Sequence, residues 1–461
     1  MGSITPQEAR FFEVQAPEII HLPETASSKS ILLEPYNVDL LPEYGYASRE
    51  YLIKGIAAGH PYCTRLLLRC PEDSSRFSGF VIEEPSHLWG GTSIWRHINR
   101  WVMRNGHAWM EVDSQAPSAV EKLKLADPER YSNIEFKPAP LCSEFQQTIP
   151  FEVNMTKEEL RDSYATFKTG WWPATQQSPE IIAAASYALR SGALGLKATR
   201  VVLSGLSQTG GLTRRFITHS SSYLRLPDGS IPFDGYIPCQ SGGEVLPDVP
   251  GAKTIELLGE AEFQSVRLPC GISGQMKEVE HRRPDSDGFR VYEVAGMAHR
   301  ESRYASAREL DRWSVVDLRG AEWSTFSNSF IYHAVFELME RWTGEMAVPP
   351  PESLLLRTVN DTDEIVRDEH GNAVGGVRTV HSDAPVSRLV ACTPKGRPAW
   401  YWGSEWRFDD KKLKSLYGTT ANYRRVAGKA LQAQLDQGLL LREDAEVLRR
   451  ETIEPIVIQD V

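Results

Sequence analysis

Residues 199–213 read T-R-V-V-L-S-G-L-S-Q-T-G-G-L-T, and this stretch decides which fold the rest of the chain has to support. A β-branched run leads into a Gly-x-Ser turn, and a segment compatible with a helix follows it. A serine on such a tight strand-to-helix turn needs small neighbours, here Gly205 and Gly210, because side chains there would collide with the backbone. The pattern predicts that Ser207 is an exposed nucleophile.

A second interpretation of this turn stays open. Thr209 occupies the position at which the common G-x-S-x-G pattern has its last glycine, so the match is imperfect. Ser207 could instead end a strand and cap the next helix with its side-chain oxygen. The nucleophile interpretation therefore depends on partners that occur later in the chain.

A candidate general base follows a later strand. Residues 289–299 read F-R-V-Y-E-V-A-G-M-A-H, a strand and then a loop of small residues that ends on His299. In a hydrolytic triad of this topology the members follow in the order serine, acid, histidine, and each stands just after a strand. His299 has this setting and is the predicted base.

The acid is expected between the serine and the histidine. Residues 254–263 read T-I-E-L-L-G-E-A-E-F, in which a strand runs through a glycine into two carboxylates. Glu262 is favoured because it stands three residues after Gly259, the common spacing for the acid of such a triad. Glu260 remains the alternative. Either carboxylate could orient the imidazole and stabilise its protonated form during attack.

The reaction also needs an oxyanion hole. One donor is the backbone N–H of Gln208, which follows the predicted nucleophile. The other is expected in the loop after the third strand, where residues 80–91 read F-V-I-E-E-P-S-H-L-W-G-G. We place it near Ser86, since the proline before that residue has no N–H, and keep Gly90 and Gly91 as alternatives.

Strand and helix patterns alternate between Thr64 and Leu338, which is typical of an α/β fold. The predicted strands are 64–69, 79–83, 107–112, 200–204, 235–238, 254–258 and 289–294. The predicted helices are 179–191, 208–220, 328–343, 411–416 and 422–450. The expected architecture is a mostly parallel central sheet flanked by helices.

Two regions depart from the alternation. Residues 116–177 carry many prolines and are predicted to form a cap insertion. Residues 348–461 add a C-terminal helical extension without a second cluster of catalytic type. This extension is expected to pack on the rest of the chain, so that residues 1–461 form a single domain.

The tryptophans bear on the substrate. Trp171 and Trp172 stand in the predicted cap, and Trp89 and Trp95 follow the third strand. They suggest an apolar, aromatic pocket and hence a small-molecule substrate, an apolar or aromatic ester. Packing in the core or the cap explains these residues equally well.

Composition excludes several classes of function. The 61 acidic and 51 basic side chains leave a formal charge of -10, so nucleic acid is not an expected partner. The start of the chain has no signal-peptide run, and Pro6 stands where a myristoylation motif needs a hydroxyl. No apolar window of membrane-spanning length occurs. We expect a cytoplasmic protein without membrane contact.

Six cysteines lie far apart and lack the spacing of a zinc site. Free thiols in a reducing compartment are the expectation. We expect neither a metal nor another cofactor.

Several further stretches carry a family resemblance. They are Y-G-Y-A-S-R-E-Y-L-I-K-G (44–55), T-R-L-L-L-R-C-P (64–71), F-S-G-F-V-I-E-E (77–84), G-H-A-W-M-E-V-D-S-Q (106–115), D-P-E-R-Y (127–131) and R-D-E-H-G-N-A-V-G-G-V-R (367–378). With them, the chain resembles the α/β-hydrolase-domain family of bacterial and fungal proteins that have a G-x-S-x-[ST] nucleophile elbow, an esterase-like group.

The resemblance implies an α/β-hydrolase fold to which the C-terminal segment belongs, and a triad of Ser207, Glu262 and His299. One loop departs from the family pattern. Where an acid-tryptophan pair leading to asparagine is expected, this chain has Glu84, Pro85 and Ser86.

The expected activity is hydrolysis of an ester-like carbonyl through an acyl-enzyme. Two alternatives remain, because one such scaffold supports many chemistries. The same triad could serve an acyltransferase or a lyase acting on a specialised metabolite, or the fold could belong to a binding protein without catalysis.

Overall fold

The computed structural model describes residues 11–88, 93–139, 175–264, 278–303, 320–391 and 402–459. The chain divides into two compact units. The first comprises Met1–Gln146, Phe167–Tyr236 and Leu246–Lys253, and the second comprises Gln147–Thr166, Ile237–Val245 and Thr254–Val461. Each unit is described by itself.

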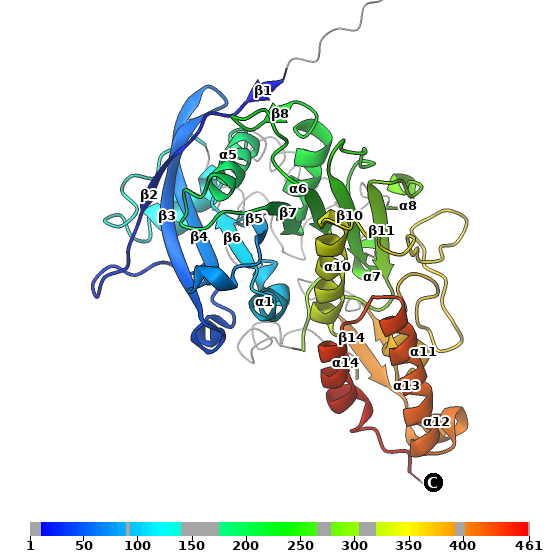
Figure 1. The fold of residues 1–461 in the computed structure, drawn as a ribbon. Coiled ribbons are helices and arrows are strands. Elements are labelled where there is room, and N and C mark those ends of the chain that lie inside the picture. Colours follow the sequence, from blue (N-terminus) through cyan, green and yellow to red (C-terminus); the bar gives the residue numbers. More distant parts are fainter. Residues whose placement is uncertain are drawn as a thin grey trace, which may run out of the picture. The chain divides into compact units, whose positions relative to one another are not determined.

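The first unit is built on a twisted sheet of six strands (Figure 1). Their spatial order is β2 (Glu18–His21), β3 (Tyr46–Ala57), β4 (His60–Pro71), β6 (Ala108–Val112), β5 (Phe80–Pro85) and β7 (Arg200–Leu206). β5 runs parallel to both β6 and β7, whereas the pairs β2–β3, β3–β4 and β4–β6 are antiparallel. β1 (Phe12–Glu13) and β8 (Leu224–Arg225) form a separate parallel pair.

Helices cover this sheet. α1 (Trp95–Arg104) contacts β6, α5 (Ser178–Ser191) contacts β3 and β7, and α6 (Gln208–His219) contacts β7 and β5. Every residue of β5 is buried, as expected for a parallel strand with both faces covered. α2 (Ala116–Ser118) and the π-helical turn Ala119–Lys124 follow β6.

The second unit contains two parallel strands, β10 (Lys253–Gly259) and β11 (Phe289–Val294), paired along their whole length. β9 (Gly235–Cys239) lies where the chain passes from the first unit to the second. A small antiparallel sheet has the order β12 (Glu322–Trp323), β14 (Ser404–Arg407) and β13 (Ser387–Val390). The short helices α7 (Glu260–Gln264) and α8 (Glu278–His281) fall between β10 and β11.

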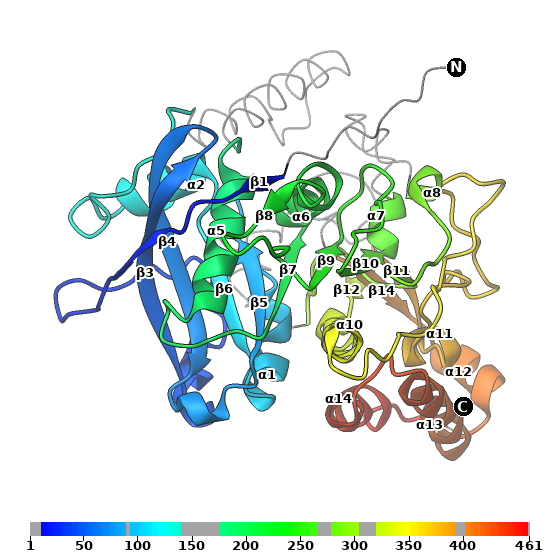
Figure 2. The same cartoon turned by 45° about the horizontal axis from the view of Figure 1, so that its top comes forward.

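The C-terminal helices of this unit follow α10 (Asn328–Thr343) in the chain and are drawn in orange and red in Figure 2. They are α11 (Val380–Asp383), α12 (Asp410–Tyr417), α13 (Thr420–Asp436) and α14 (Arg442–Leu448). Their buried side chains form one apolar cluster with Phe330 of α10. A buried hydrogen bond of 2.7 Å between His333 Nδ1 and Asp444 Oδ2 joins α10 to α14.

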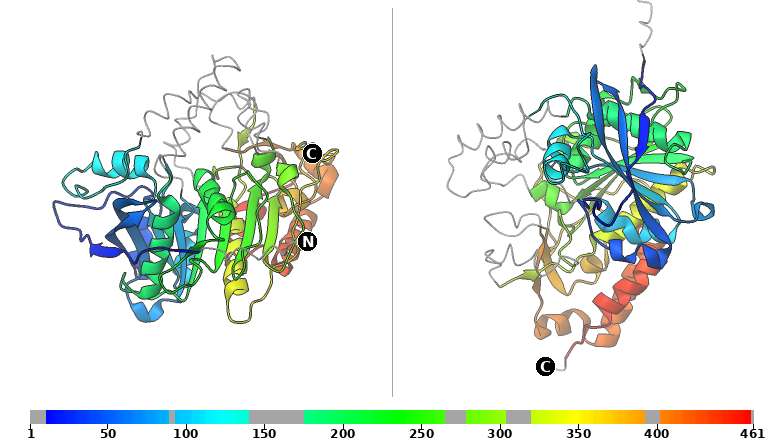
Figure 3. Two further views of the ribbon diagram at one scale, coloured as in Figure 1. Left: turned by 90° about the horizontal axis from the view of Figure 1, so that it is seen from above. Right: turned by 90° about the vertical axis from the view of Figure 1, so that its left-hand side faces the viewer.

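The structure confirms every strand that the sequence predicts, and α10 has the predicted bounds. The prediction of one helix over 422–450 is wrong. Gly438, whose φ is 71°, and its neighbours separate α13 from α14, because the left-handed backbone of a glycine ends a helix. The long strand β3 and helix α1 were not predicted. β3 and β4 are drawn in blue in Figure 3.

Three of the cysteines, Cys63, Cys70 and Cys239, are buried free thiols, and the other three lie outside the described residues. No helix in the described part of the chain is long and apolar enough to cross a membrane. Among the same residues no group of His, Cys, Asp and Glu side chains could hold a metal ion. That the protein needs no metal remains a prediction.

A buried cation organises the first unit. Arg65 of β4 is completely buried, and its guanidinium lies 2.5 Å from Glu111 Oε1 and 2.6 Å from Asp113 Oδ2. A third carboxylate, Glu50, is 3.4 Å away on β3. These opposite charges raise the pKa of the guanidinium, so Arg65 stays protonated. The network links β3 and β4 to the chain that leaves β6.

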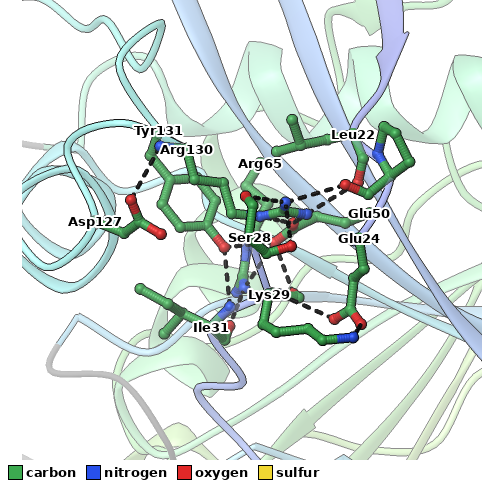
Figure 4. A network of polar contacts seen from close by, with 12 residues as sticks. Leu22, Glu24, Ser28, Lys29, Ile31, Glu50, Arg65, Asp127, Arg130 and Tyr131 are labelled. Carbon is green, nitrogen blue, oxygen red and sulfur yellow. Dashed lines mark hydrogen bonds and ion pairs between the residues drawn. The ribbon is translucent and has the colours of Figure 1, made fainter. Parts of the chain in front are cut away.

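The same network holds the N-terminal segment (Figure 4). Arg130 binds Glu50 and also donates to the backbone carbonyls of Leu22, Pro23 and Ser28. The hydroxyl of Tyr131 donates to Glu50 and accepts from the N–H of Ile31. The D-P-E-R-Y stretch at 127–131 therefore fastens residues 22–31 to β3.

We predict that Arg65→Met lowers the free energy of unfolding by about 3–5 kcal/mol, because it leaves several carboxylates buried without their cation. Lys29→Met is the control. Lys29 and Glu24 form an exposed pair, with 65% and 48% of their side chains accessible, and such pairs contribute about 0–1 kcal/mol. Chemical denaturation of both variants measures the difference. Equal effects would contradict the role given to Arg65.

Glu83 in the middle of β5 is a second unusual carboxyl group. It is completely buried, and within the described part of the chain neither side-chain oxygen has a hydrogen-bond partner. Burial raises its pKa well above the ordinary value, and the guanidinium of Arg190 opposes this rise only in part. A neutral, protonated Glu83 costs less than a buried unpaired charge.

We predict that Glu83→Leu stabilises the protein increasingly as the pH rises. The unfolded chain releases the Glu83 proton at about pH 4.3, whereas the folded protein releases it only at higher pH. The folded state of the wild type therefore binds more protons above pH 4.3, and its stability falls through that window. The leucine variant has no carboxyl group at this position and therefore lacks this pH-dependent loss of stability. Urea titrations at pH 5 and pH 8 measure the gain, and a gain that shrank toward pH 8 would contradict the assignment.

Candidate active site

Ser207 stands between β7 and α6 in a strained backbone conformation. Its φ is 60° and its ψ is -115°, which are unfavourable for a residue that has a side chain. The side chain makes no capping hydrogen bond to α6, so the interpretation of Ser207 as a helix cap does not describe this turn. The serine is partly exposed, as a nucleophile has to be.

The residues around Ser207 explain why the turn is possible. A Cβ atom on Gly205 would lie 2.4 Å from the carbonyl carbon and oxygen of Thr209, so only glycine fits there. The Thr209 hydroxyl accepts a hydrogen bond from the N–H of Leu206 at 2.9 Å and donates to its carbonyl at 3.0 Å. Threonine thus fastens the turn where the common pattern has a glycine.

In the loop after β5, two backbone N–H groups have hydrogen-bond acceptors. The N–H of Ser86 donates to the carbonyl of Val112 at 2.8 Å, and the N–H of Leu88 donates to Gln208 Oε1 at 2.9 Å. The Ser86 hydroxyl is buried and has no hydrogen-bond partner among the residues that the structure describes. The backbone donor expected at Ser86 is therefore occupied, and its hydroxyl is the group left to donate. Gly90 and Gly91, the alternatives, lie outside the described residues.

Gln208 opens helix α6, and the first N–H groups of a helix have no acceptor within it. Its side chain pairs with that of Gln115, as Gln208 Nε2 donates to Gln115 Oε1 at 2.8 Å and Gln115 Nε2 donates to Gln208 Oε1 at 3.0 Å. Gln115 was not predicted from the sequence, although it ends one of the stretches that carry the family resemblance. The two predicted oxyanion residues, Gln208 and Ser86, are thus joined through a third.

In the second unit the structure brings the predicted base and the preferred acid together. His299 Nδ1 and Glu262 Oε1 are 2.7 Å apart, and each side chain is only 3% exposed. A carboxylate at Nδ1 holds the proton on that nitrogen and leaves Nε2 to accept a proton. The pair has the geometry of an acid that orients a general base.

Glu260, the alternative acid, has hydrogen-bond partners other than His299. It is completely buried, its Oε2 accepts from the N–H of Gly296 at 2.7 Å, and its Oε1 lies 2.5 Å from Arg367 Nη1. Both carboxylates belong to helix α7, in which residues two positions apart point in nearly opposite directions. Glu262 consequently reaches the histidine, while Glu260 faces the C-terminal segment.

Two side-chain amides bind the backbone just before His299. The carbonyl of Ala298 accepts from Asn328 Nδ2 at 2.8 Å and from Gln240 Nε2 at 3.1 Å. Gln240 itself has a positive φ of 46°, so a strained residue follows β9 as well. Neither amide was predicted from the sequence, because nothing in their local patterns shows which distant carbonyl they bind.

The position of Trp95 does not support the expectation of an aromatic pocket. This residue is completely buried, its Nε1 donates to the carbonyl of Tyr36 at 2.8 Å, and its ring lies 5.3 Å from that of Trp109. Trp95 is thus part of the core, which is the second of the two interpretations. Trp89, Trp171 and Trp172 lie outside the described residues.

Residues 14–450 match the family described as alpha/beta hydrolase domain. No curated protein matches the chain. Among solved structures, it is similar to the esterase Est22, with 13% identity and a TM-score of 0.25 over 47% of this chain and 50% of that one. It is also similar to brefeldin A esterase, a bacterial homologue of human hormone sensitive lipase, with 12% identity and a TM-score of 0.23 over 43% and 40%.

A structure of fungal esterases from Rhizomucor miehei matches with 10% identity and a TM-score of 0.28, over 54% of this chain and 74% of that one. The chain spans half the length of Est22 and 40% of that of brefeldin A esterase.

The two carboxylates of α7 should respond differently to the same substitution. Glu260→Gln is expected to lower the free energy of unfolding by about 1–3 kcal/mol, because Arg367 loses its charged partner. Glu262→Gln should affect stability less and lower the turnover of p-nitrophenyl butyrate by about two to four orders of magnitude. Thermal unfolding and initial rates measure both effects. The reverse assignment of the two effects would make Glu260 the acid.

Proposed function

Because the chain belongs to the alpha/beta hydrolase domain family, we propose that it is a serine hydrolase that cleaves an ester-like carbonyl substrate. Membership confirms the α/β-hydrolase fold expected from the sequence, with its mostly parallel sheet flanked by helices. In the proposal Ser207 is the nucleophile, His299 the general base and Glu262 the acid that orients it.

The observation that carries the proposal is the backbone of Ser207. A strained serine between a strand and a helix is costly to maintain, and such strain collects at functional sites. The chain maintains it with a glycine that no other residue could replace and with a threonine bonded to the turn. A serine with a purely structural role would not need this arrangement.

The proposed reaction proceeds in two halves. Ser207 Oγ attacks the carbonyl carbon while His299 Nε2 accepts its proton, and the imidazolium then protonates the departing alcohol. Water next attacks the acyl-enzyme with the same base, which releases the acid and restores the serine. Glu262 keeps the imidazole oriented and stabilises its positive charge in both halves.

Two donors are proposed for the developing oxyanion. One is the N–H of Gln208 at the start of α6, where the helix dipole also favours negative charge. The other is the hydroxyl of Ser86, because the N–H of that residue is bonded to Val112. A hydroxyl can donate to the oxyanion as a backbone N–H does.

The remaining expectations are part of the same proposal. Residues 1–461 form one catalytic domain, in which 116–177 provide a cap and 348–461 a C-terminal extension. The substrate is a small molecule, an apolar or aromatic ester, and the protein acts in the cytoplasm.

Ser207→Ala should abolish labelling by a fluorophosphonate probe and lower ester turnover by several orders of magnitude. Thermal stability should be retained, because alanine keeps the Cβ atom and the strained backbone of the turn and loses only the hydroxyl. Ser191→Ala is the control, since its hydroxyl donates only within α5, to the carbonyl of Ala188. In-gel fluorescence and p-nitrophenyl butyrate hydrolysis measure the outcome. Labelled, active Ser207→Ala protein would refute the proposal.

A further inference from the structure

We propose that Gln115 is a positioning residue of the oxyanion site, which locks the loop after β5 to the first residue of α6. The inference rests on the proposed function and adds a residue to it. Gln115 touches neither the attacking oxygen nor a backbone donor in this role. It acts through Ser86 and Gln208, whose groups are proposed to bind the oxyanion.

Four hydrogen bonds make up the lock. Gln115 Nε2 donates to the carbonyl of Ser86 at 2.8 Å and to Gln208 Oε1 at 3.0 Å, and Gln115 Oε1 accepts from Gln208 Nε2 at 2.8 Å. Gln208 Oε1 also accepts from the N–H of Leu88 at 2.9 Å. The loop is thereby bonded on both sides of His87, at Ser86 to Gln115 and at Leu88 to Gln208.

Gln115 is itself firmly placed. It is completely buried just before α2, three residues after the end of β6, and its carbonyl accepts from the N–H of Ala119 at 3.1 Å and from the hydroxyl of Ser118 at 3.0 Å. Two residues earlier, Asp113 is bonded to the buried guanidinium of Arg65. The backbone that carries Gln115 thus continues from a residue of the buried ion-pair cluster around Arg65.

Only a primary amide of this length satisfies all the partners. The side chain at this position must donate two hydrogen bonds, to two different oxygens, and must also accept one. Glutamate would supply acceptors alone and would place its charge against the oxygens of Ser86 and Gln208. Methionine has a similar length and makes none of these bonds. Either change leaves buried polar atoms without partners.

The lock matters to the reaction because donors aimed at the oxyanion act only when they are held in place beforehand. Misplacing a donor weakens binding of the tetrahedral intermediate more than binding of the planar ester. Loss of Gln115 should therefore lower kcat and kcat/KM by the same factor. A loss of fold alone would reduce the amount of active enzyme and its stability, without slowing the reaction of each folded molecule.

The experiment compares Gln115→Met and Gln115→Glu with Gln177→Met as the matched control. Gln177 is a buried glutamine of the same unit, which accepts from the N–H of Lys137 and donates to the carbonyls of Ala57, His60 and Pro61. Active sites are titrated with a fluorophosphonate, and rates with p-nitrophenyl butyrate are expressed per titrated site. Thermal unfolding is recorded for each variant.

We expect the Gln115 variants to lose about 10- to 100-fold in both kcat and kcat/KM per site, and to react more slowly with the fluorophosphonate. Gln177→Met should lose stability and keep its rate per site. A wild-type rate per site in both Gln115 variants would overturn the inference. Ser207→Ala in the same assay separates the two proposals, since activity close to that of the wild type in that variant removes the proposed function itself.

A double-mutant cycle gives a second readout. Gln208→Met removes the same side-chain pair and leaves the Gln208 N–H in place. The double variant should then be no slower than the slower of the two single variants, because both act through one lock. Rate losses that multiply would show independent effects and would also overturn the inference.

Discussion

The positive φ of Ser207 is the constraint on which the candidate site depends. It turns the chain sharply from β7 into α6, so that the serine projects from the turn and the first helical N–H groups gather beside it. The same sharp turn brings Gly205 against the backbone of Thr209, which explains the residue types at both positions. The Thr209 hydroxyl then provides a partner for both the N–H and the carbonyl of Leu206.

A cluster of buried charges organises the rest of the first unit. A buried guanidinium on β4 neutralises carboxylates from β3 and from the end of β6, and a second arginine fastens the N-terminal segment to the same cluster. Burying so many charges contributes little net stability compared with an apolar core. The ion pairs of this cluster do connect β3, β4 and the chain after β6 in the arrangement observed. Gln115 lies two residues after Asp113, which is a member of this cluster.

The second unit supports its histidine in a comparable way. Its C-terminal segment runs beside β11, where the N–H of Val377 donates to the carbonyl of Glu293 at 2.7 Å. From this segment Arg367 reaches Glu260, and Glu260 binds the N–H of Gly296 in the loop before His299. The R-D-E-H-G-N-A-V-G-G-V-R stretch therefore contributes to the candidate site although it supplies no member of the proposed triad. Its role is to keep the loop before the histidine in one conformation.

The sequence by itself determined seven strands of the α/β fold, the strand-to-helix turn at Ser207 and the preference for Glu262 over Glu260 as the partner of His299. These features are local: hydrophobic periodicity and the spacing of a residue from the end of its strand report them directly. Only the tertiary structure decided that Glu260 binds Arg367, that the Ser86 N–H is bonded to Val112, and that Trp95 belongs to the core. It also revealed Gln115 and the break at Gly438. Each of these depends on which groups the fold brings together from distant parts of the chain, or on backbone torsion, and the order of residue types does not encode such choices locally.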